Sequence, residues 1–335
     1  MKEIEIVPGQ DPSKIISANL HCNNFIIKEG NYPSLSTQRE DLTIEGDGQV
    51  VVSLGFAATD WTKEGDYFKR ITREKLVDHH MFGVVEFGGE AYSRVEDFDH
   101  LGFATRLFYV DPETNEVYIN PEGDPGQLLL VDWKDAVVVG RRSVLVNLSI
   151  CHGVEGVELR HADHVSLFNC RIHSITTQGI LGGREAPGLT VMNCAFRNIG
   201  KRYELHQGEI RENNKDHAIY YYGDDGYIAA NSMIGIAEHQ VRHRYELHIW
   251  GSNVYSSGVT IADNDIEGTV MIAGGPHRFL NNTIRCDLSD PVRYWDGAIV
   301  LDDGGRRGPA ERKLNSANSG TLSPGPGIRW LAGPS

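Results

Sequence analysis

A short pattern of alternating apolar and polar residues recurs along the second half of the chain. It reads apolar, any, apolar, any, Asn, any two residues, then Ile or Phe. Alternation with a period of two buries one side of a strand, so each copy predicts a buried strand that runs into a bend at the Asn. Six copies are present, at Val144–Ile150, Val165–Ile172, Leu189–Phe196, Ile228–Ile234, Val259–Ile266 and Phe279–Ile284.

The spacing of the copies predicts a solenoid of stacked coils. The steps between the Asn-like positions are 22, 24, 38, 32 and 18 residues, for Asn147, Asn169, Asn193, Asn231, Asp263 and Asn281. The short steps match one coil, and the long ones add loop insertions to the same coil. Asn at one repeated bend can bond the Asn of the next coil through its amide, which predicts an Asn ladder. Cys170 and Cys194 each follow such an Asn and are expected to stack as buried core thiols.

A second strand precedes each copy of the pattern. These strands are Gly156–Arg160, Gly179–Leu181, Ala218–Gly223, Glu246–Gly251, Val270–Gly274 and Ala298–Asp302. With both strands in each coil, the chain resembles the pectate-lyase-like superfamily of right-handed parallel β-helices, over roughly half its length. The resemblance implies an all-β solenoid and a carbohydrate-active protein. It implies no single activity, because that superfamily includes lyases, glycoside hydrolases, epimerases, phage tailspikes and adhesins.

The rest of the chain divides around this solenoid. Residues 1–55 are predicted to start it, with first strands in Phe25–Tyr32 and Leu42–Gly46. Residues 56–136 break the period and predict an inserted β subdomain with a hairpin, Leu107–Val110 and Glu116–Ile119. Residues 137–303 hold the coils and their loops. Residues 304–335 are rich in Gly, Pro, Ser and Arg and predict an irregular tail or a truncated solenoid end.

Composition excludes several partners. The net charge of −14 argues against nucleic acid, and no apolar run is long enough to span a membrane. The start, MKEIEIVPGQ, lacks the apolar stretch of a signal peptide, which fits a cytoplasmic protein or a secreted one whose signal has been removed. Five cysteines without close pairing indicate reduced thiols. An uncapped solenoid end would expose strand edges and permit self-association.

Strand alternation sorts the second strand set into inward and outward residues. A face washed only by solvent would carry Thr, Ser, Lys and Asn, whereas Tyr220, Tyr222, His248 and Trp250 are predicted to face outward on two successive coils. Such a face predicts a platform that stacks sugar rings, with His and Tyr available for proton transfer. The two outward rows are Glu158, Leu181, Tyr220, His248, Met271, Val300 and Arg160, Gly183, Tyr222, Trp250, Ala273, Asp302.

The three long steps place extra residues beside this face. The insertions Arg197–Lys215, Gly235–Tyr245 and Arg285–Trp295 are predicted to emerge along one edge of the solenoid and form a cleft. A positive patch among them suits a uronate carboxylate. The polar residues in and around these loops are Arg202, Glu204, His206, Glu209, Arg211, Asp216, His217, His239, Arg242, His243 and Arg244.

Each of these residues also has a purely structural interpretation. Tyr220 and Tyr222 could pack under the neighbouring loops. Asp216 and His217 could hydrogen-bond a turn, and His239, His243 and Arg244 could be solvated loop residues.

Three functions remain open on the sequence. The first is a polysaccharide lyase or uronate epimerase, in which an arginine such as Arg244 neutralises the carboxylate, His217 or His248 abstracts a proton, and Tyr220 or Tyr222 donates one. The second is a glycoside hydrolase, which needs two carboxyl groups across the scissile bond, drawn from Asp216, Glu246, Glu204 and Glu158. The third is a glycan-binding or tailspike-like module. Lyase-type chemistry is preferred, because His, Tyr and Arg residues cluster here without an obvious Asp pair on one coil.

No metal or other cofactor is predicted. Calcium is common in lyases of the superfamily that the chain resembles, and it would need clustered carboxylates on the front face. The close pairs are Asp224–Asp225 and Asp302–Asp303, which lie far apart in the predicted stack, so the sequence gives calcium no support.

Overall fold

The computed structural model of the chain describes most of the coils and much of the inserted segment. The described residues are 3–71, 83–86, 92–95, 97–111, 113–114, 116–126, 128–131, 134–159, 161–183, 186–200, 203–206, 209–212, 216–236, 239–243, 246–247, 253–254, 257–273, 277–285 and 299–302.

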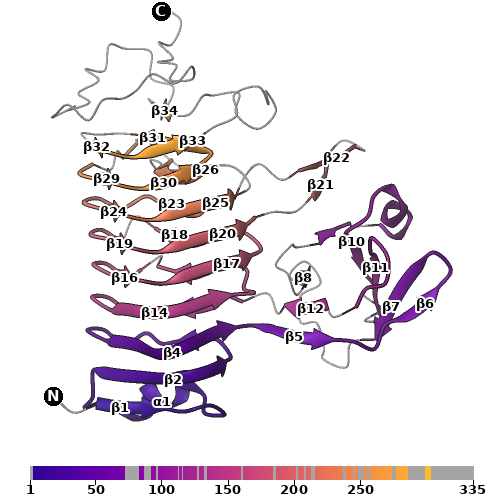
Figure 1. Cartoon of the computed structure of the whole chain (residues 1–335), viewed down its shortest axis with the longest axis horizontal. Helices are drawn as coiled ribbons and strands as arrows, with labels where there is room; N and C mark the ends of the chain where they lie inside the picture. Colours follow the sequence, from indigo (N-terminus) through magenta and orange to yellow (C-terminus); the bar gives the residue numbers. More distant parts are fainter. Residues whose placement is uncertain are drawn as a thin grey trace, which may run out of the picture.

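The molecule is a rod of parallel strands with a smaller β unit projecting from its side (Figure 1). One sheet, called the front sheet here, contains eight parallel strands in chain order. Its members are β3 (Leu35–Ser36), β13 (Val137–Val138), β15 (Val157–Glu158), β18 (Ile180–Gly182), β23 (Ile219–Tyr221), β26 (His239–His243), β31 (Thr269–Ala273) and β34 (Ile299–Asp302).

The other two sides of the rod join through one long strand, β14 (Val144–Cys151). Its first half pairs with β16 (Ser166–Phe168) and its second half with β17 (Arg171–Ile175). One side continues as β19 (Thr190–Met192), β24 (Tyr227–Ala229), β29 (Thr260–Ala262) and β32 (Arg278–Leu280). The other continues as β20 (Ala195–Ile199), β25 (Ser232–Ile236), β30 (Asp265–Glu267) and β33 (Thr283–Arg285). Below β14 lie β4 (Thr43–Ser53), β2 (Asn24–Tyr32) and β1 (Glu3–Ile6), as the pattern predicted for the first strands.

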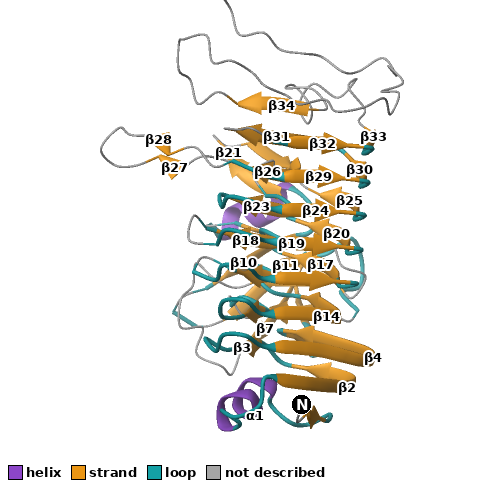
Figure 2. Ribbon diagram, turned by 90° about the vertical axis from the view of Figure 1, so that its left-hand side faces the viewer, coloured by secondary structure: helices purple, strands orange, loops and turns teal. Residues whose placement is uncertain are grey.

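Apolar residues of every coil meet inside the rod and form one continuous core. Val157, Ile180 and Ile219 of the front sheet have no exposed surface, and the same holds for Ile172 and Phe196 on the facing side. No single coil could bury these side chains alone, so their burial depends on stacking. The helix α1 (Pro12–Ala18) covers the N-terminal end of the rod (Figure 2). No described helix has the length and apolarity that crossing a membrane would require.

The bend between the two halves of each coil is made by residues in the left-handed region. Asn147, Asn169 and Asn193 have φ near +55° and are exposed. Asn tolerates this conformation better than other non-glycine residues. Ala230, Asp263 and Asn281 take the same position in later coils.

Hydrogen bonds between Asn side chains occur one residue further along, which differs from the predicted register. Asn231 donates its amide to Asn264 over 3.0 Å, and Asn264 donates to Asn282 over 2.8 Å. Each amide oxygen also accepts the backbone N–H of the residue one coil below, so the bend is satisfied inside the core. In the earlier coils this inward position is held by Leu148, Cys170 and Cys194, all buried.

The inserted segment leaves the rod after β4 and forms two sheets, which are antiparallel except for the parallel pair of β9 and β10. One sheet contains β5 (Gly55–Ala58), β12 (Leu128–Val131) and β8 (Gly83–Glu86); the other contains β6 (Thr62–Glu64), β7 (Tyr67–Ile71), β11 (Glu116–Asn120), β10 (Leu107–Val110) and β9 (Ser93–Arg94). The predicted hairpin is present as β10 and β11. A 3₁₀ helix, η1 (Phe98–Phe103), packs against this second sheet.

A histidine fixes the place where this segment leaves the rod. Ser53, the last residue of β4, shares a 2.8 Å hydrogen bond with Nδ1 of His152. The ring of His152 meets that of His173 edge-on at 6.2 Å. Burial, together with the neighbouring His173, lowers the pKa of His152 to about 4, and burial lowers the pKa of His173 as well.

One predicted front strand is wrong. The sequence placed Glu246–Gly251 in the front sheet, but Val241 of β26 takes the position beside Ile219. His239–His243 and Glu246–Gly251 both alternate, and the sequence analysis chose Glu246–Gly251 because it is more apolar. In the structure, His239–His243 is the segment that pairs in parallel with the neighbouring front strands. Glu246 instead belongs to β27 (Glu246–Leu247), which forms a separate antiparallel hairpin with β28 (Asn253–Val254). The extra residues of this coil therefore follow the front strand rather than precede it, so the three insertions do not share one edge.

Candidate functional site

A column of polar residues lies where the chain enters each front strand. Asp135, Glu155, Gln178 and His217 each come two residues before an inward apolar residue. Backbone bonds from Ala136 to Glu155, from Gly156 to Gln178 and from Gly179 to His217 stack these positions on successive coils. Tight packing between the coils keeps the column together: a Cβ on Gly156 would lie within 2.4 Å of the carbonyl oxygen of Gly179.

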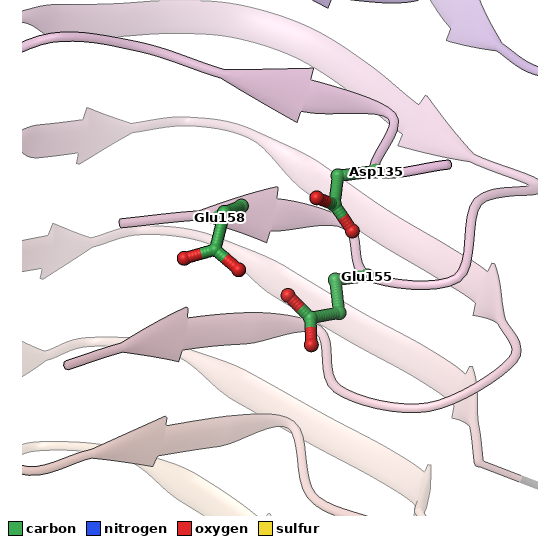
Figure 3. A group of neighbouring side chains, drawn as sticks. All are labelled: Asp135, Glu155 and Glu158. Atoms are coloured by element: carbon green, nitrogen blue, oxygen red, sulfur yellow. The ribbon is translucent and has the colours of Figure 1, made fainter. Parts of the chain in front are cut away.

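Three carboxyl groups converge at the N-terminal end of this column (Figure 3). Asp135 and Glu155 come from the column, and Glu158 is the outward residue of β15. One oxygen of each lies within 4.8 Å of the others. Glu155 is the most enclosed, with 8% of its surface exposed.

Two of these carboxyl groups line a cavity. Its volume is about 270 Å³, and it opens on the front sheet. Asp135 and Glu158 supply the acidic side of its wall. The other lining residues are Gln38, Val138, Val139, Leu159, His161 and Ala162. The lining of the cavity thus combines apolar residues with two carboxyl groups and other polar side chains.

Asp216 and His217 are held by Gln178 in the next coils. The Gln178 amide donates to Oδ1 of Asp216 over 2.9 Å, and its oxygen accepts the backbone N–H of His217 over 2.8 Å. Asp216 is 4% exposed and His217 has no exposed surface. These predicted catalytic residues are therefore neighbours, but their burial keeps them from direct contact with a polymer in this conformation.

Two predicted tyrosines lie together just beyond His217. The ring of Tyr220 is 5.0 Å from that of His217 and 4.7 Å from that of Tyr222. Tyr220 and Tyr222 are half-buried, whereas Tyr221 between them is buried and donates its hydroxyl to the carbonyl of Asp224. Alternation along β23 thus leaves two aromatic rings on the outer side.

The register of β26 changes the predicted outward row. Arg242 takes the position beside Tyr220, His243 the position beside Tyr221, and His239 pairs with Thr269. Glu246 lies in the β27–β28 hairpin. Arg211 lies in another hairpin, β21 (Tyr203–His206) with β22 (Glu209–Glu212). Arg160, Arg244, His248 and Trp250 lie outside the described residues.

Sequence reasoning named Glu158 as a possible member of a carboxyl pair but missed Asp135 and Glu155. Both precede their strands at turns, where acidic residues are common. The available signal was their position: each stands two residues before the inward residue, Val137 or Val157, of a front strand. Aligning the coils on those inward residues would have stacked the two carboxyl groups beside Glu158.

Within the described part of the chain, the same three carboxyl groups could hold a metal ion. Their oxygens suit a hard divalent cation, although calcium usually takes six to eight oxygen ligands. The sequence contains acidic residues that cluster only after folding, so the close pairs along the chain were a poor guide to such a site. The sequence predicted no metal, and that stays a prediction.

Comparison with known proteins identifies the fold of the chain. No protein-family model matches it, and no curated protein matches it. A solved structure described as XylC in complex with xylose is similar, with a TM-score of 0.52 and 12% sequence identity, over 84% of this chain and 62% of that chain. This chain therefore spans less than two thirds of the XylC chain. The protein is a right-handed parallel β-helix, as the repeat predicted.

Two further structures align more loosely. One described as a glycoside hydrolase has a TM-score of 0.43 at 10% identity, over 90% of this chain and 96% of that chain. The other is the Gp54 tailspike of Acinetobacter baumannii bacteriophage AP22 in complex with A. baumannii capsular saccharide. It has a TM-score of 0.26 at 12% identity, over 84% of this chain and 56% of that chain.

Proposed function

We propose that this protein is a glycoside hydrolase whose reacting carboxyl groups are Asp135 and Glu158. The observation that carries the proposal is their convergence on one cavity of sugar-sized volume at the front of a β-helix. Hydrolysis becomes preferable to the lyase chemistry that the sequence favoured, because that preference depended on the lack of a carboxyl pair. The similarity to the structure of XylC with xylose fits this proposal.

The separation of the carboxyl groups favours a retaining mechanism. Retaining glycosidases place the two groups about 5–5.5 Å apart, and inverting ones place them about 6.5–9.5 Å apart to admit a water molecule. One oxygen of each group lies within 4.8 Å of the other here, which is closer than the separation that inverting enzymes use. Asp135 attacks the anomeric carbon and forms a covalent glycosyl–enzyme, while Glu158 protonates the departing oxygen. Glu158 then removes a proton from the water that releases the sugar.

Glu155 acts behind this pair. Its enclosed carboxyl group lies within 4.8 Å of both. At this distance a charge on Glu155 acts on both reacting groups.

Substitution of the pair tests the proposal. On a panel of aryl glycosides and oligosaccharides, Asp135→Asn and Glu158→Gln should each lower kcat at least about a hundredfold, the scale of lost acid–base catalysis. Azide should rescue Asp135→Ala by giving a glycosyl azide of inverted configuration, and rescue Glu158→Ala by giving one of retained configuration. Asp263→Asn is the matched control, because Asp263 is exposed at the bend between β29 (Thr260–Ala262) and β30 (Asp265–Glu267), in a left-handed conformation that Asn tolerates.

Other outcomes separate the alternatives. Unsaturated uronate products, detected by ultraviolet absorbance, would show that the reaction is elimination and not hydrolysis. Glycan binding without turnover would support a binding module instead. EDTA should leave hydrolysis unchanged, because the proposed steps use only protein carboxyl groups. A loss restored by calcium would mean that the three carboxyl groups hold a cation.

A further inference from the structure

The cavity at Asp135 and Glu158 lies near the N-terminal end of the front sheet. In the described part of this sheet, β3 alone precedes β13. Beyond β3 the rod is closed by α1, whose Ser13 hydroxyl accepts the backbone N–H of Ser36 over 2.9 Å.

The segment after β3 bounds the N-terminal side of the cavity and is held in place by hydrogen bonds. Gln38 follows β3 and lines the cavity directly. The next residue, Arg39, donates its guanidinium to the carbonyls of Ile16 and Cys22, at 2.7 and 2.8 Å. These bonds tie the segment after β3 to the helix and to the turn that follows it. A sugar that entered the cavity would meet Gln38 on the N-terminal side.

In the opposite direction the front sheet continues with β18 and β23. Register places Glu158, Leu181 and Tyr220 in one row on successive strands. Strands in a sheet are spaced about 4.8 Å apart, so Tyr220 lies roughly 10 Å from Glu158. The paired rings of Tyr220 and Tyr222 offer the nearest described aromatic surface in this direction.

We infer that the site is one-ended: the terminal sugar of a glycan occupies the cavity, and the remaining chain runs toward Tyr220 and Tyr222. The enzyme is then exo-acting and releases single sugars from a chain end. This inference rests on the proposed function and deepens it. It also explains the role of Glu158, which is the carboxyl group on the side of the departing chain and so stands nearest to the oxygen that needs a proton.

The inference makes the tyrosines positioning residues for the departing chain. An aromatic ring offers an apolar face on which a sugar ring can stack. Affinity should therefore rise with the length of the oligosaccharide until its chain reaches Tyr220. An aryl glycoside with a single sugar is too short to contact Tyr220 and gains no affinity from it. Tyr220→Ala should raise KM about two- to tenfold for an oligosaccharide and leave kcat/KM for the aryl monosaccharide unchanged.

Two variants control for structural damage. Tyr220→Phe keeps the ring and should keep the wild-type KM. Tyr227→Ala removes a tyrosine that is 40% exposed in β24, in a different sheet, and should have no effect on any substrate. Thermal unfolding of Tyr220→Ala shows whether the site remains folded, and unchanged turnover of the aryl monosaccharide gives the same control on activity.

The product pattern decides between one-ended and open binding. With oligosaccharides labelled at the reducing end, the first product should be a single sugar together with a labelled chain shorter by one. Internal fragments of mixed length at early times would overturn the one-ended site while leaving hydrolysis intact. No turnover of any oligosaccharide or aryl glycoside would instead remove the proposed function and this inference with it.

Discussion

At the scale of single residues, Gln178 links the acidic end of the front column to its aromatic end. It is 8% exposed, and both ends of its amide are used, one by Asp216 and one by the backbone of His217. A buried polar group that loses its partner costs about 1–3 kcal/mol. The site therefore depends on a residue that need not touch a substrate.

Replacing Gln178 should destabilise the fold. Gln178→Ala removes both bonds, so we expect the free energy of unfolding to fall by about 2–3 kcal/mol in urea titrations. Gln178→Glu should also destabilise, because it places a carboxylate against Asp216. Thr190→Ala, at a half-buried position of β19, should change stability by no more than about 0.5 kcal/mol. A Gln178→Ala variant as stable as this control would show that the two bonds contribute nothing.

Individual residues also show what the sequence could and could not predict about the site. Tyr220 and Tyr222 were predicted to face outward, and they are half-buried on the outer side of β23. Asp135 was missed because its neighbour in the site, Glu155, is twenty positions away and reaches it only after one complete coil. Proximity of that kind is a product of stacking and has no local signature.

At the scale of elements, the bends are as regular as the strands. Six coils place a left-handed residue at the same corner, and five of the six are Asn or Asp. The sixth is Ala230, with φ of +56°. A left-handed residue with a Cβ costs roughly 1–2 kcal/mol, and Asn relieves part of this cost.

Ala230→Asn should therefore stabilise the protein. We expect a gain of about 0.5–1 kcal/mol in the free energy of unfolding, measured in urea. The backbone N–H of residue 230 would keep its 3.0 Å bond to the carbonyl of Ala262. Ala195→Asn is the comparison, because Ala195 starts a strand and Asn is unfavourable in strands. A gain at both positions would argue that the bend is not the cause.

The strands also show what alternation of apolar and polar residues cannot predict. The six copies of the repeat predicted the strands on either side of the bend, because their apolar residues must face the core. Glu246–Leu247–His248 alternates at least as clearly as His239–Gln240–Val241, yet β26 is the strand that pairs with β23. The choice depends on loop lengths and on register against the next coil, β31, neither of which is encoded in a single strand.

At the scale of the whole molecule, two histidines couple the stability of the rod to pH. His152 and His173 lie where β4 passes into β5, and burial is the main cause of the lowered pKa of each. In the unfolded chain an imidazole titrates near 6.5. Between that value and about 4, the unfolded chain binds a proton that the folded protein does not bind at His152. Stability must therefore fall as the pH is lowered through this range.

The size of the effect can be measured by comparing His152→Asn with the wild type. For His152 alone, the wild type should lose roughly 2 kcal/mol of unfolding free energy between pH 7 and pH 5, at about 1.4 kcal/mol per pKa unit. Asn can still bond the Ser53 hydroxyl but does not titrate, so the variant should be less sensitive to pH by that amount. Because Ser53 ends β4 and Gly55 starts β5, acidification should weaken the root of the inserted segment first. Proteolysis at pH 5 should then cut the wild type near residues 53–55 sooner than His152→Asn, and equal rates for the two would place the acid-sensitive contact elsewhere.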